Sequence, residues 1–480
     1  MWAKLAVQGG KDLDGSAPCG YDARVSNKIV AGEPKSSVPK SSTLPSKATP
    51  PVADQAKNDA TKDVAAVRDD TKSIAAPDSR TPVVTTLGAM TQPGLDTLRP
   101  PVRREPAYGA SLPLSGTGDA FANYQLLSTY TDFVDGVTGL ASEKLAGANR
   151  DFLSQATRFG LAAAEFTLIN RGRLLAHEYG HANAARNVGM SSHLEYFDFV
   201  GGEGVTMLEG VATPQQLLTF QLGGLNQSET NLVYLHEESA RRGQLTLGKA
   251  FLALASTFDD TGYIALTAYQ DAHGSPWPYA DPSNLQTSFA RFGKTVTYEH
   301  MLQKALVADL FSSLTWESAS AAFDYVRTGQ RVFDRQTHEV FGQKLLGPDV
   351  ALLRSIYGDN FRIMTTINPG REGAWDVRLD VRTNPDNWDV NAIGARIQKL
   401  DAVKLDAMQL TFSPYVGMST QLRPNDIGTP EEKQVGEFGF TFRANVAKNI
   451  TVFGDAGVGK SWDGALERDS HVSMAVRYGW

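Results

Sequence analysis

Two histidines and a glutamate stand close together in the segment His177-Glu178-Tyr179-Gly180-His181. If this segment is helical, His177 and His181 lie one turn apart on the same face, so that both imidazoles can bind one metal ion. Neutral imidazole is a good ligand for zinc, and bound zinc lowers the pKa of water. Glu178 can then take a proton from that water. The pattern predicts a hydrolytic metal centre with His177 and His181 as metal ligands and Glu178 as the general base.

The motif is unusual for this composition. The chain has 8 histidines among 480 residues, so the same spacing followed by Glu arises by chance on the order of one time in a hundred. The alternative is a surface or half-buried helix with two unrelated histidines. Further candidates for a group that stabilises the transition state are His273, His300 and Tyr298.

A catalytic zinc site usually has three protein ligands and one open position. The metzincin pattern expects Gly and His where this chain has Ala184 and Asn187, so that pattern is excluded. The third ligand must therefore come from another part of the chain.

Two family resemblances point to different third ligands. The segment from Glu237 to Arg241 resembles the E-x-x-A-D element of the gluzincins that include the CAAX-prenyl endopeptidases. This resemblance implies Glu237 as the preferred third ligand, and Glu238 and Glu229 remain as alternatives. Arg241 replaces the Asp that orients a ligating histidine in that family. The segment 177–189 is also similar to the first motif of site-2-type metalloproteases. That resemblance implies an aspartate from a later helix, for which Asp259 and Asp260 are the candidates.

Composition narrows the class of protein. The hydrophobic fraction is 41%, and the net charge of -7 with a pI near 5.7 argues against a nucleic-acid partner. Cys19 is the single cysteine, so no intrachain disulfide can form. No apolar run reaches the roughly 18 residues of a transmembrane helix. The first residues lack the apolar segment of a signal peptide.

Three regions are expected, and together they predict an α+β fold. Residues 1–110 are rich in Pro, Ser and Lys and are expected to be a disordered tail. Residues 111–347 show helical periodicity, which predicts a helical peptidase-like domain. Residues 348–480 alternate between apolar and polar types, which predicts an antiparallel β-domain. The expected helices are 138–146, 150–169, 171–188, 214–222, 228–242 (with Ser228 as N-cap), 247–258 and 298–314, and 269–284 is expected to be a loop.

The last strand carries a third resemblance. Val472, Met474, Val476, Tyr478 and Trp480 alternate with smaller or polar residues up to the chain end. This pattern resembles the final strand of bacterial outer-membrane β-barrels, which implies an outer-membrane barrel and export to the envelope. A soluble antiparallel sheet is the alternative. An additional strand for the barrel is expected within 194–208.

These observations together predict a zinc-dependent metalloendopeptidase of the bacterial cell envelope, at the outer membrane or in the periplasm. Zn²⁺ is the expected cofactor, and a protein or peptide is the expected substrate. The alternative is a non-catalytic envelope protein with a binding or structural role.

Overall fold

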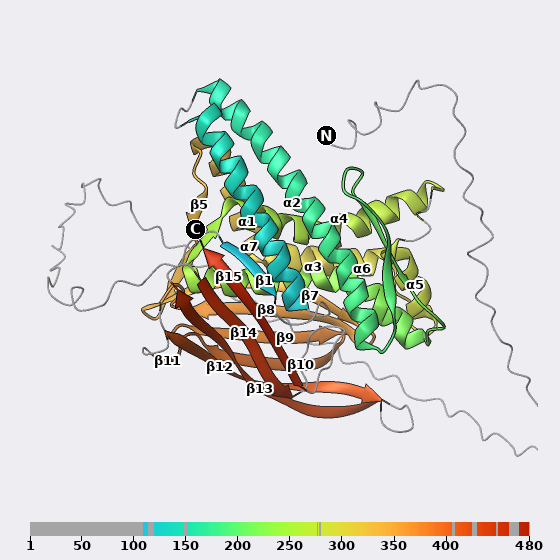
Figure 1. The fold of residues 1–480 in the computed structure, drawn as a ribbon. Helices are drawn as coiled ribbons and strands as arrows, with labels where there is room; N and C mark the ends of the chain where they lie inside the picture. The colour runs from blue at the N-terminus through green and yellow to red at the C-terminus, as the bar shows by residue number, and fades with distance from the viewer. Residues whose placement is uncertain are drawn as a thin grey trace, which may run out of the picture. The chain divides into compact units, whose positions relative to one another are not determined.

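The computed structural model describes residues 109–113, 120–147, 151–275, 277, 280–371, 373–405, 409–424, 430–447, 450–459 and 470–479. The predicted disordered tail lies outside these residues, except for Gly109 and Ala110, which belong to a strand. Cys19 and Trp480 also lie outside them. The described residues belong to one compact unit, and they combine helices with a large antiparallel sheet (Figure 1). The predicted α+β fold is confirmed.

Seven helices occur in the described part of the chain. They are α1 (Ala120–Leu145), α2 (Phe152–Asn187), α3 (Pro214–Arg242), α4 (Leu247–Ala272), α5 (Asp281–Ala290), α6 (Tyr298–Phe311) and α7 (Ser313–Thr328). Side-chain oxygens of Asp151, Thr213, Thr246 and Thr297 cap the starts of α2, α3, α4 and α6. These caps satisfy backbone amides that would otherwise lack partners.

Two pairs of predicted helices are each one continuous helix. The segments 150–169 and 171–188 join in α2, because no proline or glycine pair interrupts them. The segments 214–222 and 228–242 join in α3, although Gly223 and Gly224 lie between them. The prediction that Ser228 is an N-cap is therefore wrong, since Ser228 lies inside α3. The predicted loop 269–284 is shorter than expected, because α4 extends to Ala272 and α5 begins at Asp281.

The large sheet has eleven strands in the order β1-β15-β14-β13-β12-β10-β9-β8-β7-β6, with β11 paired to β12. Its strands are β1 (Gly109–Pro113), β6 (Thr337–Val340), β7 (Gln343–Ser355), β8 (Gly358–Ile367), β9 (Trp375–Thr383), β10 (Val390–Lys399), β11 (Val403–Leu405), β12 (Leu410–Pro424), β13 (Pro430–Ala447), β14 (Ile450–Gly459) and β15 (Ser470–Gly479). The predicted domain boundary at residue 347 falls inside β7. Strand β1 pairs with β15, which joins the two ends of the described chain.

Two small sheets stand apart from the large one. Strands β2 (Ser192–Asp198) and β3 (Glu203–Leu208) form a hairpin of their own, and β4 (Gln244–Thr246) pairs with β5 (Val332–Asp334). The prediction that 194–208 adds a strand to the β-domain is therefore wrong. The hairpin packs instead against α2, where it bears on the candidate site.

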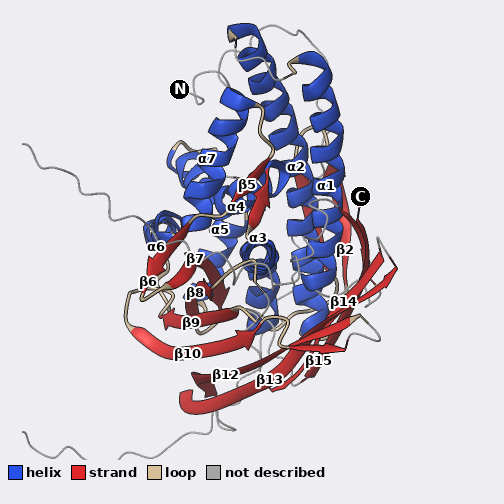
Figure 2. Cartoon of the chain, turned by 90° about the vertical axis from the view of Figure 1, so that its left-hand side faces the viewer, coloured by secondary structure: helices blue, strands red, loops and turns tan. Residues whose placement is uncertain are grey.

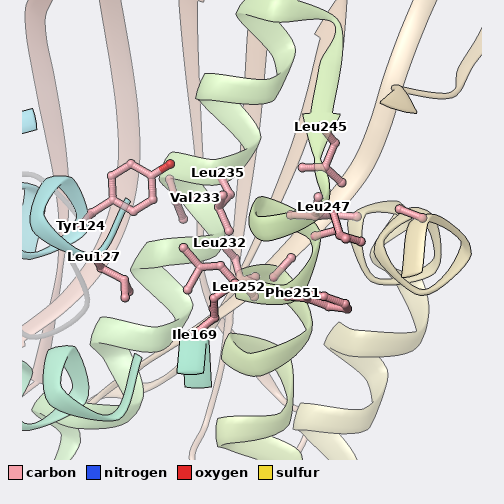
Figure 3. Packing of buried hydrophobic residues seen from close by; sticks show 14 of the residues in the cluster. Tyr124, Leu127, Ile169, Leu232, Val233, Leu235, Leu245, Leu247, Phe251 and Leu252 are labelled. Carbon is pink, nitrogen blue, oxygen red and sulfur yellow. The ribbon is translucent and has the colours of Figure 1, made fainter. Parts of the chain in front are cut away.

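Helix α3 lies at the centre of the described residues (Figure 2). Strands β7 to β10 and β12 to β15 curve beneath it, so that α3 lies on their inner side (Figure 2). Apolar residues of α3 and α4 form a core with residues of α1 and α2 (Figure 3). This core includes Tyr124, Leu127, Ile169, Leu232, Val233, Leu235, Leu247, Phe251 and Leu252. No helix in the described ranges is both long enough and apolar enough to cross a membrane.

Candidate metal centre

Helices α2 and α3 cross at an unusually short distance, and glycines permit it. A Cβ atom at Gly180 would lie 2.4 Å from the carbonyl oxygen of Gly223, and one at Gly223 would lie 2.6 Å from the carbonyl oxygen of Gly180. A Cβ at Gly224 would lie 2.2 Å from Nε2 of His177 and 2.5 Å from Nε2 of His181. The crossing therefore holds both imidazoles directly against the backbone of α3.

The two histidines converge on an aspartate that begins α5. Nε2 of His177 lies 3.1 Å, and Nε2 of His181 lies 3.2 Å, from Oδ2 of Asp281. Each of the three residues offers one ligand atom, and these three atoms lie within 4.8 Å of one another. The histidines are 3% and 5% exposed and Asp281 is 8% exposed. The geometry thus gathers three ligands for a metal ion in a buried position.

The other ring nitrogen of each histidine is already engaged. Nδ1 of His177 lies 2.7 Å from Oδ2 of Asp259, and Nδ1 of His181 lies 2.7 Å from the carbonyl oxygen of Phe220. Each Nδ1–H therefore donates to a fixed acceptor, which leaves the Nε2 lone pair for a metal. Asp259 is itself held by the hydroxyl of Ser228, which donates over 2.6 Å, and by an ion pair with Arg173.

Charge pairing dominates the protonation of the centre. Burial alone would lower the pKa of His177, but the carboxylates of Asp259 and Asp281 outweigh it and raise that pKa to about 10. Burial alone would raise the pKa of Asp281, but the two imidazoles lower it to about 2. Both shifts mean that the buried carboxylates are stable as anions when a positive charge lies beside them. A divalent cation meets the same requirement, and its binding releases the protons.

Glu178 lies beside this group and faces the β2–β3 hairpin. Its Oε2 accepts a hydrogen bond of 2.8 Å from the hydroxyl of Thr206 on β3. A Cβ at Gly204 would lie 2.6 Å from Cγ of Glu178, so β3 passes directly over the glutamate. The predicted general base is therefore next to the three ligands, but its carboxylate is covered in this conformation.

Tyr263 on α4 completes the surroundings of the histidines. Its hydroxyl oxygen accepts a hydrogen bond of 3.1 Å from the amide of Asp281, and its ring centroid lies 6.1 Å from that of His177. Burial, followed by the nearby charges of Asp281 and Glu178 among others, raises the pKa of Tyr263 well above its usual value. The phenol therefore stays protonated and can donate a hydrogen bond. The sequence makes Tyr298 a candidate for this role, but the Tyr298 hydroxyl contacts Asp271 and Ser283.

The structure does not bring Glu237 to the histidines, which corrects the predicted third ligand. Because α3 is continuous, Glu237 lies 13 residues after Gly224, which is about 20 Å along the helix axis. Its carboxylate forms an ion pair with Arg378 on β9. The alternatives are also engaged elsewhere. Glu238 contacts Tyr124 and Arg242, and Glu229 accepts a hydrogen bond of 2.7 Å from the amide of Leu352.

The other two candidates have different positions. Asp259 reaches His177 at Nδ1 and therefore orients a ligand rather than serving as one. Asp260 forms an ion pair of 2.6 Å with Arg354. His236, the neighbour of Glu237, lies between Asp349 and Asp376, and Nδ1 of His273 contacts the carbonyl oxygen of Tyr269. Within the described ranges, the group that could hold a metal ion is His177, His181 and Asp281.

No family model matches this chain, and no curated protein or solved structure matches it.

Proposed function

We propose that this protein is a zinc-dependent metalloendopeptidase of the bacterial cell envelope. The observation that carries the proposal is the convergence of two Nε2 atoms and the Asp281 carboxylate beside Glu178. A helix with two unrelated histidines would not be expected to hold both Nδ1 atoms on acceptors while both Nε2 atoms face one carboxylate. The envelope location follows from the alternating C-terminal strands and remains part of the proposal.

The donor set fits zinc. Two imidazoles and one carboxylate form the three-ligand set of many catalytic zinc sites, and the fourth position is left for the reaction. His177, His181 and Asp281 would hold the ion. When bound, zinc supplies a Lewis acid that polarises a carbonyl group and makes water more acidic.

The chain's own residues then have distinct tasks. Glu178 takes the proton of the attacking water and later delivers it to the leaving amine. Tyr263 donates a hydrogen bond toward the carbonyl oxygen of the substrate as negative charge develops there. Asp259 and the carbonyl oxygen of Phe220 keep the imidazoles in the tautomer that leaves Nε2 free.

A peptide substrate requires part of the structure to move, because the three ligands are almost completely buried. The β2–β3 hairpin is the element that covers Glu178, and most residues of β2 are exposed to solvent. Displacement of this hairpin would break the hydrogen bond from Thr206 and free the carboxylate. Slow opening would limit the rate, as for many active-site loops.

The test combines metal analysis with cleavage of an unfolded protein such as casein. Wild type is expected to bind one zinc ion and to cleave casein, whereas Glu178→Gln should bind zinc normally and lose cleavage. His177→Ala should lose both. If the wild type binds no zinc, or if Glu178→Gln cleaves as fast as wild type, the proposal is wrong.

The burial of the centre also favours a second candidate, a non-catalytic envelope protein. In this candidate the ion pairs of His177 and His181 with Asp281 join α2 to α5 and have a structural role. Zinc binding without cleavage by wild type, combined with a large loss of thermal stability in Asp281→Asn, would support this second candidate.

A further inference from the structure

One face of the sheet formed by β9, β10 and β12 to β15 is apolar and open to solvent. A row of directly opposed residues crosses five of these strands, from Val377 through Ile397, Val416 and Phe438 to Val458. Val416 and Phe438 are 58% and 65% exposed. We call this surface, on the side of the sheet away from α3, the outer face.

The outer face extends over several such rows. Its members are the odd-numbered residues in 375–381 and 393–397 and the even-numbered residues in 412–420, 434–446, 450–458 and 472–478. Within these described positions none is Asp, Glu, Lys or Arg. Charged residues would be common here if the sheet simply faced water.

The opposite face has the reverse polarity. Asp376, Arg378, Asp380 and Arg382 alternate with the apolar residues of β9 and are all buried. Arg378 forms ion pairs with Asp376 and with Glu237 of α3, and Asp380 forms one with Arg362 on β8. On β9 the charged side chains are therefore turned inward, and the apolar side chains are turned outward.

The outer face is larger than a typical exposed apolar patch. The six strands are separated by five spacings of about 4.8 Å, and each strand has about nine residues that rise 3.3 Å. The face therefore covers an area of roughly 700 Å². The largest apolar patch on a typical monomer is about 300–600 Å². Strands β9, β10, β14 and β15 have 9 or 10 residues, which is about the length of a strand that crosses the hydrocarbon of a bilayer.

The shape and the rim of this surface distinguish between occupants. The sheet curves around α3 (Figure 2), so two outer faces can touch only along a strip and a second copy would leave most of the area in water. Lys399 lies at the edge of the face, 5.3 Å from the ring of Trp375. A basic residue beside an aromatic ring suits the boundary between hydrocarbon and lipid headgroups.

We infer that the outer face of β9, β10 and β12 to β15 packs against the hydrocarbon of a lipid bilayer. The inference does not depend on the metal centre, since it uses none of its residues. Lipid contact accounts for an uncharged outer face together with a charged, buried inner face.

Fluorescent labels test this directly in the full chain. In a Cys19→Ser background, single cysteines are introduced as Val416→Cys and Phe438→Cys on the outer face and as Ser320→Cys, an exposed position on α7. Each is labelled with nitrobenzoxadiazole and reconstituted into phosphatidylethanolamine and phosphatidylglycerol vesicles. Nitroxide groups on lipid acyl chains quench labels in hydrocarbon, whereas aqueous iodide quenches labels in water.

The outer-face labels are expected to be quenched by nitroxide lipid and protected from iodide, with the reverse result for Ser320→Cys. If iodide quenches the outer-face labels as strongly as it quenches the label on α7, the inference is overturned. It is also overturned if those labels are protected without lipid in a protein dimer, as measured by analytical ultracentrifugation.

A charge substitution gives an independent measurement. Val416→Lys should reduce the fraction of protein that floats with vesicles by at least about tenfold, because a lysine in hydrocarbon is costly. Ser320→Lys is the matched control and should float like the wild type. Equal flotation of the wild type and Val416→Lys would contradict the inference.

Discussion

The substitution Gly224→Ala tests the geometry of the metal centre with a single added methyl group. Gly224 lies inside α3, and its absent Cβ would point at the Nε2 atoms of His177 and His181. Alanine is favoured over glycine in a helix by about 1 kcal/mol, so the local backbone preference supports folding of the variant. The added carbon instead enters the space in front of both metal-binding nitrogens.

The size of the effect follows from the distances. The added Cβ would lie 2.2 Å from Nε2 of His177, whereas an ordinary contact between such atoms is about 3.4 Å or more. The imidazole or the helix must therefore shift by about 1.2 Å. Metal sites tolerate only about 0.2 Å of deviation in their ligand distances. We therefore expect zinc affinity to fall by more than about 100-fold, beyond the loss seen when only an orienting residue is removed.

Zinc affinity is measured by competition with a chromophoric chelator, and folding by far-ultraviolet circular dichroism. Gly136→Ala is the matched control, because it makes the same change inside α1 with no atom within 4 Å of the new Cβ. This control should bind zinc like the wild type and should unfold at an equal or higher temperature. If folded Gly224→Ala keeps wild-type zinc affinity, then the two Nε2 atoms do not bind one ion beside α3.

Three further predictions concern the metal ligands, the hydrogen-bond donor Tyr263 and a buried histidine. Asp281→Asn should weaken zinc binding by at least about tenfold, whereas Glu237→Gln should leave it unchanged. The reverse result in chelator competition would make Glu237 the third ligand, as the sequence predicts. Tyr263→Phe should lower kcat by about 10²-fold with little change in KM or zinc content, and an unchanged kcat in a casein-peptide assay would remove the phenol from the reaction. Burial alone would lower the pKa of His236, but the two carboxylates that flank it raise the pKa to about 9. The charged imidazole therefore stabilises the fold fully below about pH 6.5, and this stabilisation is lost as the pH rises through 9. The free energy of unfolding in urea should then fall by up to about 3 kcal/mol between pH 7 and 10, and His236→Gln should lack this fall. If the free energy of unfolding depends on pH in the same way in both proteins, His236 is not held charged by these carboxylates.

The part of the centre that the sequence could predict is the part set by one helix. Spacing along α2 fixes the relative positions of His177, Glu178 and His181, because residues four apart share a helix face. In the structure Nε2 of His177 and Nε2 of His181 both lie against Oδ2 of Asp281, and Glu178 follows His177 in α2. No long-range information is needed for that arrangement.

Asp281 could not be identified in the same way. It lies 100 residues after His181, at the end of a segment rich in proline and aromatic residues that local patterns describe only as a loop. Its position depends on how α5 packs against α3 and α4, and on the hydrogen bond from its amide to Tyr263. Tyr263, by contrast, has a local signal, since it lies four residues after Asp259 on the same face of α4.

In the β-domain, too, local patterns predict the elements, whereas contacts with other segments decide how they are oriented. Alternation correctly predicts strands such as β9, β13 and β15, because successive side chains point to opposite faces. Alternation alone does not say which face is turned toward the rest of the protein. That choice is made by partners from other segments, such as the bonds that Arg241 on α3 makes to Asp401, Ser413 and Thr441.

Gly223 and Gly224 show why the error about α3 is connected with the error about the third ligand. A pair of glycines in a helical pattern suggests a break, and a break there would let a separate helix carry Glu237 back toward the histidines. In the structure α2 packs directly against the backbone of α3 at these glycines, and their missing side chains allow α3 to continue past the two imidazoles. Continuity then carries Glu237 about 20 Å away and leaves the third position to Asp281. A feature that weakens a helix in isolation thus determines which acid reaches the candidate metal site.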